Sequence, residues 1–96
     1  MGFKEKYDFD PLVNEAERLV LAELEAQVSR TPGLCTCQDC VLDMAAYALN
    51  KVRPSYRVSL MGSVYANRPQ QTEYAREISR AVKEAIEKVK ANPSHD

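Results

Sequence analysis

The sequence lacks any long run of apolar residues. Its most apolar stretch, residues 40–50, contains the charged Asp43 and is shorter than the roughly 20 residues that cross a bilayer. The N-terminus also lacks the apolar segment of a secretory signal, because charged side chains begin at Lys4. Together these absences predict a cytoplasmic protein without a transmembrane helix.

An excess of charge of either sign is missing as well, since thirteen basic and fourteen acidic side chains give a net charge of −1. A nearly neutral chain has no overall field that attracts DNA or an anionic membrane, so we expect no direct DNA binding and no membrane association. Hydrophobic and charged contents of 45% and 28% are typical of globular proteins, and 96 residues suit one domain. We expect a single domain over 1–96, with flexible termini at 1–9 and 92–96.

The spacing of apolar residues predicts three main helices. The first covers about 11–29, where apolar side chains recur every three or four residues. Asp10 can cap this helix, and Pro11 at its first position sacrifices no hydrogen bond. Pro32 and Gly33 predict its end, because proline cannot continue a helix and glycine accepts the left-handed conformation that closes one.

The second predicted helix covers 37–51. Thr36 matches a capping residue with an acid three positions later, Asp39. Arg53 and Pro54 predict the end of this helix, because the residue before a proline avoids the helical conformation.

The helical period is lost over 54–68, which predicts an ordered loop or a short hairpin. A third helix is expected from Pro69 to the residues just before Asn92 and Pro93. The predicted fold class is therefore all-α: a small helical domain of about three main helices with an irregular or short hairpin segment.

Cys35, Cys37 and Cys40 fall within six residues, at the predicted start of the second helix. Free backbone amides and the positive end of the helix dipole favour thiolates there. Because thiolates bind zinc, and one turn plus one helical turn can gather three sulfurs around a metal ion, we expect a structural zinc site. The alternatives are three ordinary cysteines or a thiol redox role, although the sequence around them lacks the context of a thioredoxin motif.

A structural zinc site needs a fourth ligand besides three thiolates. The single histidine, His95, is one candidate, although a residue in the tail is as readily solvated. Asp39 and Asp43 are the alternatives, and Asp39 also suits a helix cap. Water in the fourth position would open the site to catalysis, but no general base stands at a defined spacing. We therefore predict that the chain is not an enzyme.

Residues 51–70 contain four basic side chains and no acid: Lys51, Arg53, Arg57 and Arg68. Guanidinium groups bind phosphates and guanine through paired donors, and an aromatic ring such as that of Tyr56 can stack on a base. The segment suits a small phosphate-bearing ligand better than a long nucleic acid, because overall neutrality removes the advantage of counterion release. In the competing interpretation, each arginine pairs with a glutamate of the first helix.

The run from Cys35 to Tyr56 resembles the signature C-x-C-x-x-C-x-x-D, followed by A-L-N-x-L-P-P-x-Y, of the late competence development protein ComFB family. Residues 89–95 also resemble the family's ending. One departure is Arg53, which stands where the family often has proline. The resemblance implies a mainly helical homodimer, cysteine-bound zinc in at least some members, and reception of the second messenger cyclic di-GMP. It also implies control of competence, pili, motility or cell size through a partner protein.

The leading hypothesis is a non-enzymatic, homodimeric cyclic di-GMP receptor that relays the signal to an unidentified effector protein. The expected ligand-binding residues are Lys51, Arg53, Tyr56, Arg57 and Arg68. The expected ligands of a structural zinc ion are Cys35, Cys37, Cys40 and His95. The alternative is a zinc-stabilised protein-interaction module without a nucleotide ligand, and a thiol redox sensor is the third hypothesis.

Overall fold

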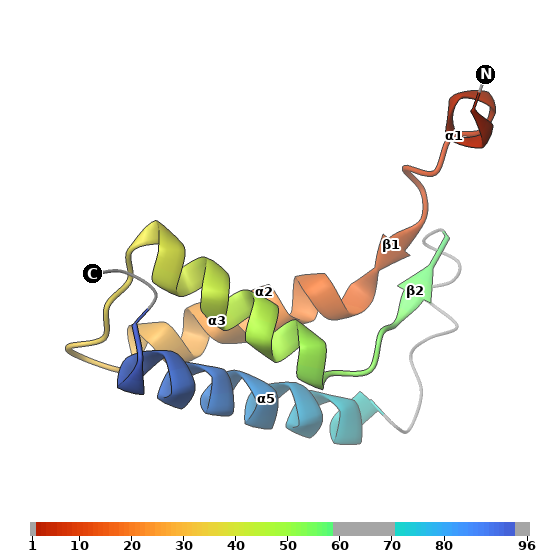
Figure 1. The fold of residues 1–96 in the computed structure, drawn as a ribbon. Helices are drawn as coiled ribbons and strands as arrows, with labels where there is room; N and C mark the ends of the chain where they lie inside the picture. The colour runs from red at the N-terminus through yellow and green to blue at the C-terminus, as the bar shows by residue number, and fades with distance from the viewer. Residues whose placement is uncertain (1, 59–70, 94–96) are drawn as a thin grey trace.

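The computed structural model describes residues 2–58 and 71–93 (Figure 1). Three long helices lie alongside one another: α2 (Glu15–Ser29), α3 (Gln38–Lys51) and α5 (Gln71–Ala91). A single helical turn, α1 (Phe3–Lys6), stands apart from them. Two short strands, β1 (Val13–Asn14) and β2 (Tyr56–Arg57), form a small antiparallel sheet. The predicted all-α class with three main helices is confirmed.

The core lies between the three long helices, and the largest interface joins α3 to α5. Small buried side chains let these two backbones approach closely: Ala45 and Ala48 on α3, and Ala81 and Ala85 on α5. The largest fully buried side chains are Met44, Val20, Val82 and Cys40. No polar or charged residue is buried within residues 2–58 and 71–93, so burial of apolar surface holds the bundle together.

The first long helix begins later than the sequence predicts. The predicted start at Pro11, capped by Asp10, is wrong, because α2 begins at Glu15 and its cap is Asn14. The side-chain Oδ1 of Asn14 accepts a hydrogen bond from the amide of Ala16 at 3.1 Å. The backbone of residues 13–14 is extended instead and forms strand β1. Pairing with a distant strand therefore overrides the local helix signal.

The loop or short hairpin predicted over 54–68 is described only as far as residue 58, and the rest of it lies outside the described residues. Its extended part, β2, pairs with a segment that is far away in the sequence. Tyr56 of β2 pairs with Asn14 of β1, so no hairpin within the segment forms this sheet. The amide of Ser55 also donates to Oδ1 of Asn14 at 2.9 Å, and the amide of Glu15 donates to the carbonyl of Ser55 at 2.6 Å. Asn14 therefore caps α2 and fastens the chain that follows α3.

The remaining helix ends agree more closely with the sequence. Helix α2 ends at Ser29, as predicted, but its cap is Arg30. Gly33 adopts a left-handed φ of 79° further along, in the link to α3, so it shapes this link and does not close the helix as predicted. The cap of α3 is Cys37, not Thr36 as predicted. The third predicted helix is confirmed over 71–91, while its predicted start at Pro69 lies outside the described residues. None of the described helices is both long enough and apolar enough to cross a membrane.

Replacing Asn14 with alanine tests the double role of this side chain. We expect Asn14→Ala to lower the free energy of unfolding by about 1–2 kcal/mol, because it leaves two backbone amides without their acceptor. Urea unfolding monitored by circular dichroism measures the change. Asn14→Asp is the control, since its carboxylate keeps an acceptor in the same place. Equal stability of Asn14→Ala and the wild type would contradict this role.

Candidate functional site

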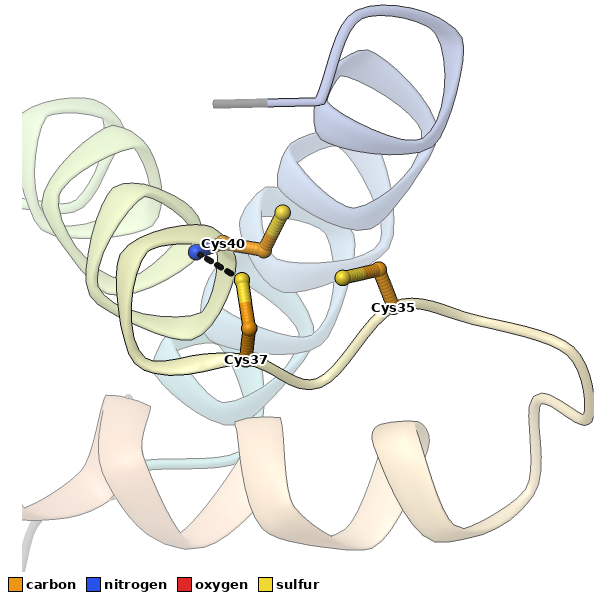
Figure 2. A group of neighbouring side chains, drawn as sticks. All are labelled: Cys35, Cys37 and Cys40. Atoms are coloured by element: carbon orange, nitrogen blue, oxygen red, sulfur yellow. Dashed lines mark hydrogen bonds between the residues drawn. The ribbon is translucent and has the colours of Figure 1, made fainter. Parts of the chain in front are cut away.

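The three cysteines come together at the N-terminal end of α3. Cys35 lies in the link after α2, Cys37 is the cap of α3, and Cys40 lies in the helix's first turn. Their sulfur atoms all lie within 4.8 Å of one another (Figure 2). Cys40 is buried, Cys35 is half-buried and Cys37 is exposed, so the cluster reaches from the core to the surface.

The end of the helix favours a thiolate at Cys37. Its Sγ accepts a hydrogen bond from the backbone amide of Cys40 at 3.4 Å, drawn as a dashed line in Figure 2. This hydrogen bond is the main reason why the pKa of the Cys37 thiol is lowered, and it outweighs burial, which raises the pKa. Weaker hydrogen bonds from the Cys35 and Cys40 thiols lower the pKa further. The arrangement favours the protonation state that binds metals.

The cluster fits a structural zinc ion. Zinc bonds to sulfur at about 2.3 Å, which in a tetrahedral site places neighbouring sulfurs roughly 3.8 Å apart. The observed limit of 4.8 Å is therefore close to a binding geometry. A zinc ion there would join the link after α2 to the first turn of α3, beside the core residues that Cys40 contacts. Its chemistry at this place would be structural.

The described residues supply three ligands and leave the fourth open. Asp39 and Asp43 are exposed and do not belong to the group of potential metal ligands that the structure places together. His95 lies outside the described residues, as does Arg68. Of the predicted metal ligands, the structure therefore brings Cys35, Cys37 and Cys40 together.

Two of the predicted ligand-binding cations, Lys51 and Arg53, lie at the opposite end of α3. The ε-amino group of Lys51 lies 5.5 Å from the centroid of the Tyr47 ring. The guanidinium of Arg53 lies 5.3 Å from the centroid of the Tyr74 ring, and its Nε donates to Glu77 at 2.9 Å. The Arg53 side chain is nevertheless 65% exposed. Lys51 and Arg53 thus present positive charge to solvent, each beside an aromatic ring.

Arg57 has a different environment. Its Nε donates to Oε1 of Glu15 at 2.8 Å, and the two side chains are only 19% and 13% exposed. Glu15 also accepts from Arg18, and this hydrogen bond is the main cause of its lowered pKa, which burial opposes and Arg57 reinforces. The pair joins β2 to the first turn of α2. Tyr56, the neighbour of Arg57 on β2, is exposed.

The competing interpretation of the arginines is therefore correct for Arg57, which pairs with a glutamate of the first long helix. Arg53 also pairs with a glutamate, but Glu77 belongs to α5. Sequence reasoning missed Glu77 and Tyr74 as neighbours of Arg53, although the hydroxyl of Tyr74 donates to the Arg53 carbonyl at 2.6 Å. The sequence does place Tyr74 and Glu77 three residues apart on one predicted helix, so that both side chains lie on the same face. This spacing could have indicated that they share a neighbour.

Comparison with known proteins decides the family. The profile of the family described as late competence development protein ComFB matches residues 13–93. The chain belongs to the ComFB family. Its matched span includes both the cysteine cluster and Arg53, and the predicted family is confirmed.

A solved structure supports the same conclusion for this ComFB chain. The late competence protein ComFB from Bacillus subtilis is similar with a TM-score of 0.70 and 28% sequence identity, over 86% of this chain and 92% of that chain. A search of curated proteins finds no match. The present ComFB chain is thus a competence-related protein with the small helical fold of its relative.

Replacing Cys37 with serine separates metal binding from helix capping, because a serine hydroxyl still caps a helix. We expect wild-type ComFB to contain about one zinc per chain and Cys37→Ser to contain less. A chelator should lower the melting temperature of the wild type and leave that of Cys37→Ser unchanged, since zinc stabilises only the folded chain that binds it. Elemental analysis, thiol titration and thermal unfolding measure these effects. Removal of zinc without any loss of stability would contradict a structural role.

The pairing of Glu15 predicts a pH dependence of stability. Because its pKa is lowered below the ordinary value of 4.5, its carboxylate stabilises the fold fully above that value and loses this effect as the pH falls through the folded-state pKa. We expect wild-type ComFB to exceed Glu15→Gln in stability at pH 7, with a difference that shrinks towards pH 3. Urea unfolding with a chelator present measures it, and Glu17→Gln, an exposed change in the same helical turn, is the control. A gap that stays constant with pH would contradict the pairing.

Proposed function

We propose that this ComFB chain is a non-enzymatic, homodimeric receptor for cyclic di-GMP that relays the signal to a partner protein. Membership of the ComFB family supports the proposal, because the resemblance to that family implies reception of this second messenger. The observation that carries it is the exposed cationic end of α3, where Arg53 lies over Tyr74 and Lys51 lies near Tyr47.

The chemistry of this end of α3 suits a ligand with two phosphates and two guanines. An exposed ion pair such as that of Arg53 with Glu77 contributes only about 0–1 kcal/mol, so a phosphate can compete for the guanidinium. The guanidinium and the exposed ring of Tyr56 both offer planes on which a guanine can stack. Lys51 adds a second positive charge, and Arg68 remains part of the proposed set.

Arg57 has a supporting role in this proposal. Because Arg57 is largely buried against Glu15, it would have to break this ion pair to bind a phosphate. Its contribution is then to hold β2, and with it Tyr56, against the start of α2. The zinc ion has a similarly structural role at the other end of α3, with His95 as its proposed fourth ligand.

Isothermal titration with cyclic di-GMP tests the receptor function. We expect binding by the wild type and at least about tenfold weaker binding by Arg53→Ala, since a charged hydrogen bond contributes about 1.5–3 kcal/mol. Lys90→Ala is the matched control, because it removes one exposed positive charge from the last turn of α5. Arg57→Ala should instead lower the free energy of unfolding.

Three outcomes would contradict this assignment. The absence of a heat signal with tens of micromolar cyclic di-GMP would exclude the receptor function, and equal affinities of the wild type and Arg53→Ala would exclude this location. Equal binding of cyclic di-AMP would show that the guanines are not recognised.

The second candidate function is a zinc-stabilised protein-interaction module without a nucleotide ligand. The cysteine cluster favours this function, because the close approach of the three sulfur atoms is explained by a metal ion alone, without a nucleotide. In that case a chelator lowers the melting temperature while cyclic dinucleotides leave it unchanged. The same thermal-shift panel therefore separates the two functions.

A further inference from the structure

The cysteine cluster combines one residue that solvent reaches with one that it does not. Cys37 is exposed and Cys35 is half-buried, whereas Cys40 is 0% exposed. The three sulfur atoms nevertheless lie within 4.8 Å of one another (Figure 2). An accessible thiol beside a second thiol is the arrangement of a redox-active pair, in which the first sulfur is oxidised and the second then bonds to it. Metal binding does not require this difference in exposure.

Cys37 and Cys40 are the two cysteines that the backbone places at a suitable spacing for a disulfide. Cys37 is the N-cap of α3, and Cys40 lies three residues further on, in the first turn. The rise and radius of an α-helix place the Cα atoms of such residues about 5 Å apart, which falls within the roughly 4.4–6.8 Å that disulfides span. The amide of Cys40 also donates to Sγ of Cys37 at 3.4 Å, so this sulfur lies beside the residue that it would join.

Cys35 is less suitable as a partner for Cys37. It lies in the link before α3, outside any helix and two residues away from Cys37. A bond between Cys35 and Cys37 would close a ring that is one residue shorter, and departures from ordinary disulfide geometry store strain. Cys35 is therefore expected to stay a thiol when the other two cysteines are oxidised.

We propose that Cys37 and Cys40 form a reversible disulfide with hydrogen peroxide as the oxidant, so that the cluster is a thiol oxidation site as well as a metal site. The sulfur of Cys37 attacks one peroxide oxygen: an S–O bond forms, the O–O bond breaks, and the leaving hydroxide takes the thiol proton as water. The sulfur of Cys40 then attacks that of Cys37: the S–S bond forms, the S–O bond breaks, and hydroxide leaves with the Cys40 proton as a second water. Two thiols are oxidised and one peroxide is reduced.

This disulfide would also release a bound metal ion. It removes two of the three thiolates that the described residues offer to zinc, and a disulfide sulfur no longer has the charge that binds the ion. Oxidation therefore detaches the link after α2 from the first turn of α3, and reduction with zinc present restores the connection. The release of zinc rests on the structural site proposed above. The disulfide itself depends on neither zinc nor cyclic di-GMP.

Mass mapping of the wild type tests which sulfurs are joined. The full chain is stripped of metal with a chelator, treated with hydrogen peroxide and alkylated with iodoacetamide. Trypsin then cuts after Arg30 and Lys51 and leaves the three cysteines in one peptide. We expect this peptide to lack two hydrogen atoms and to carry one alkyl group, on Cys35. Dithiothreitol before alkylation should restore three alkyl groups. An alkyl group on Cys37 or Cys40 of the oxidised peptide, or a sulfinic acid in place of the disulfide, would overturn the proposal.

Single variants, also tested without metal, identify the sulfur that reacts first. Cys37→Ser should react with peroxide at least tenfold more slowly than the wild type, because its remaining cysteines are half-buried and buried. Cys40→Ala should leave a sulfenic acid on Cys37, which dimedone labels. Cys35→Ser is the matched control and should form the disulfide as fast as the wild type. Helical content by circular dichroism shows that each variant is folded, and neither serine change touches a fully buried side chain. Equal rates for Cys37→Ser and the wild type, or loss of the disulfide in Cys35→Ser, would contradict the proposed pair.

The zinc-loaded wild type tests the coupling to the metal. A zinc-sensitive dye should report release of zinc at the same rate as the disulfide forms, and dithiothreitol with added zinc should reverse both changes. Zinc that stays bound after the disulfide has formed would overturn the coupling. Because none of these measurements contains a nucleotide, their outcome is independent of the titration with cyclic di-GMP.

Discussion

Close packing of α3 against α5 is the constraint on which the rest of the structure depends. Alanines on both helices allow this approach, and Met44 and Val82 fill the space beside them. The two candidate sites lie at the two ends of α3, so this one interface positions both. At the first end, Cys40 belongs to the buried core as well as to the thiol cluster. At the second, Arg53 rests on a ring and a carboxylate that α5 supplies.

The small sheet extends this constraint to the start of α2. Asn14 caps that helix and accepts from Ser55, while Glu15 pairs with Arg57. These polar contacts are few, but each gives a hydrogen-bond partner to a backbone amide or to a half-buried charged group that would otherwise lack one. They hold the segment after α3 in place, and so determine where Tyr56 is presented. The geometry of the proposed ligand site therefore rests on a cap forty residues away.

The two arginines that follow α3 differ in how far they are exposed to solvent. Arg57 is largely buried against Glu15, so it serves the fold, whereas Arg53 is mostly exposed and its ion pair is weak. The same difference in exposure separates a structural cation from one that a phosphate can reach.

Much of this protein was determined by local sequence. The apolar spacing predicts the three long helices, because each buries one face, and three cysteines within six residues meet because one turn of chain suffices to gather them. Tertiary structure alone decided which carboxylates Arg53 and Arg57 contact and which segment pairs with Tyr56, since these partners lie 24 to 42 residues away. It also decided that α2 begins at Glu15 and not at the predicted Pro11, because residues 13–14 pair with β2 as a strand. Contacts between distant segments depend on how the helices pack. Helical periodicity predicts which face of a helix is buried, but it does not predict which residues of another helix that face contacts.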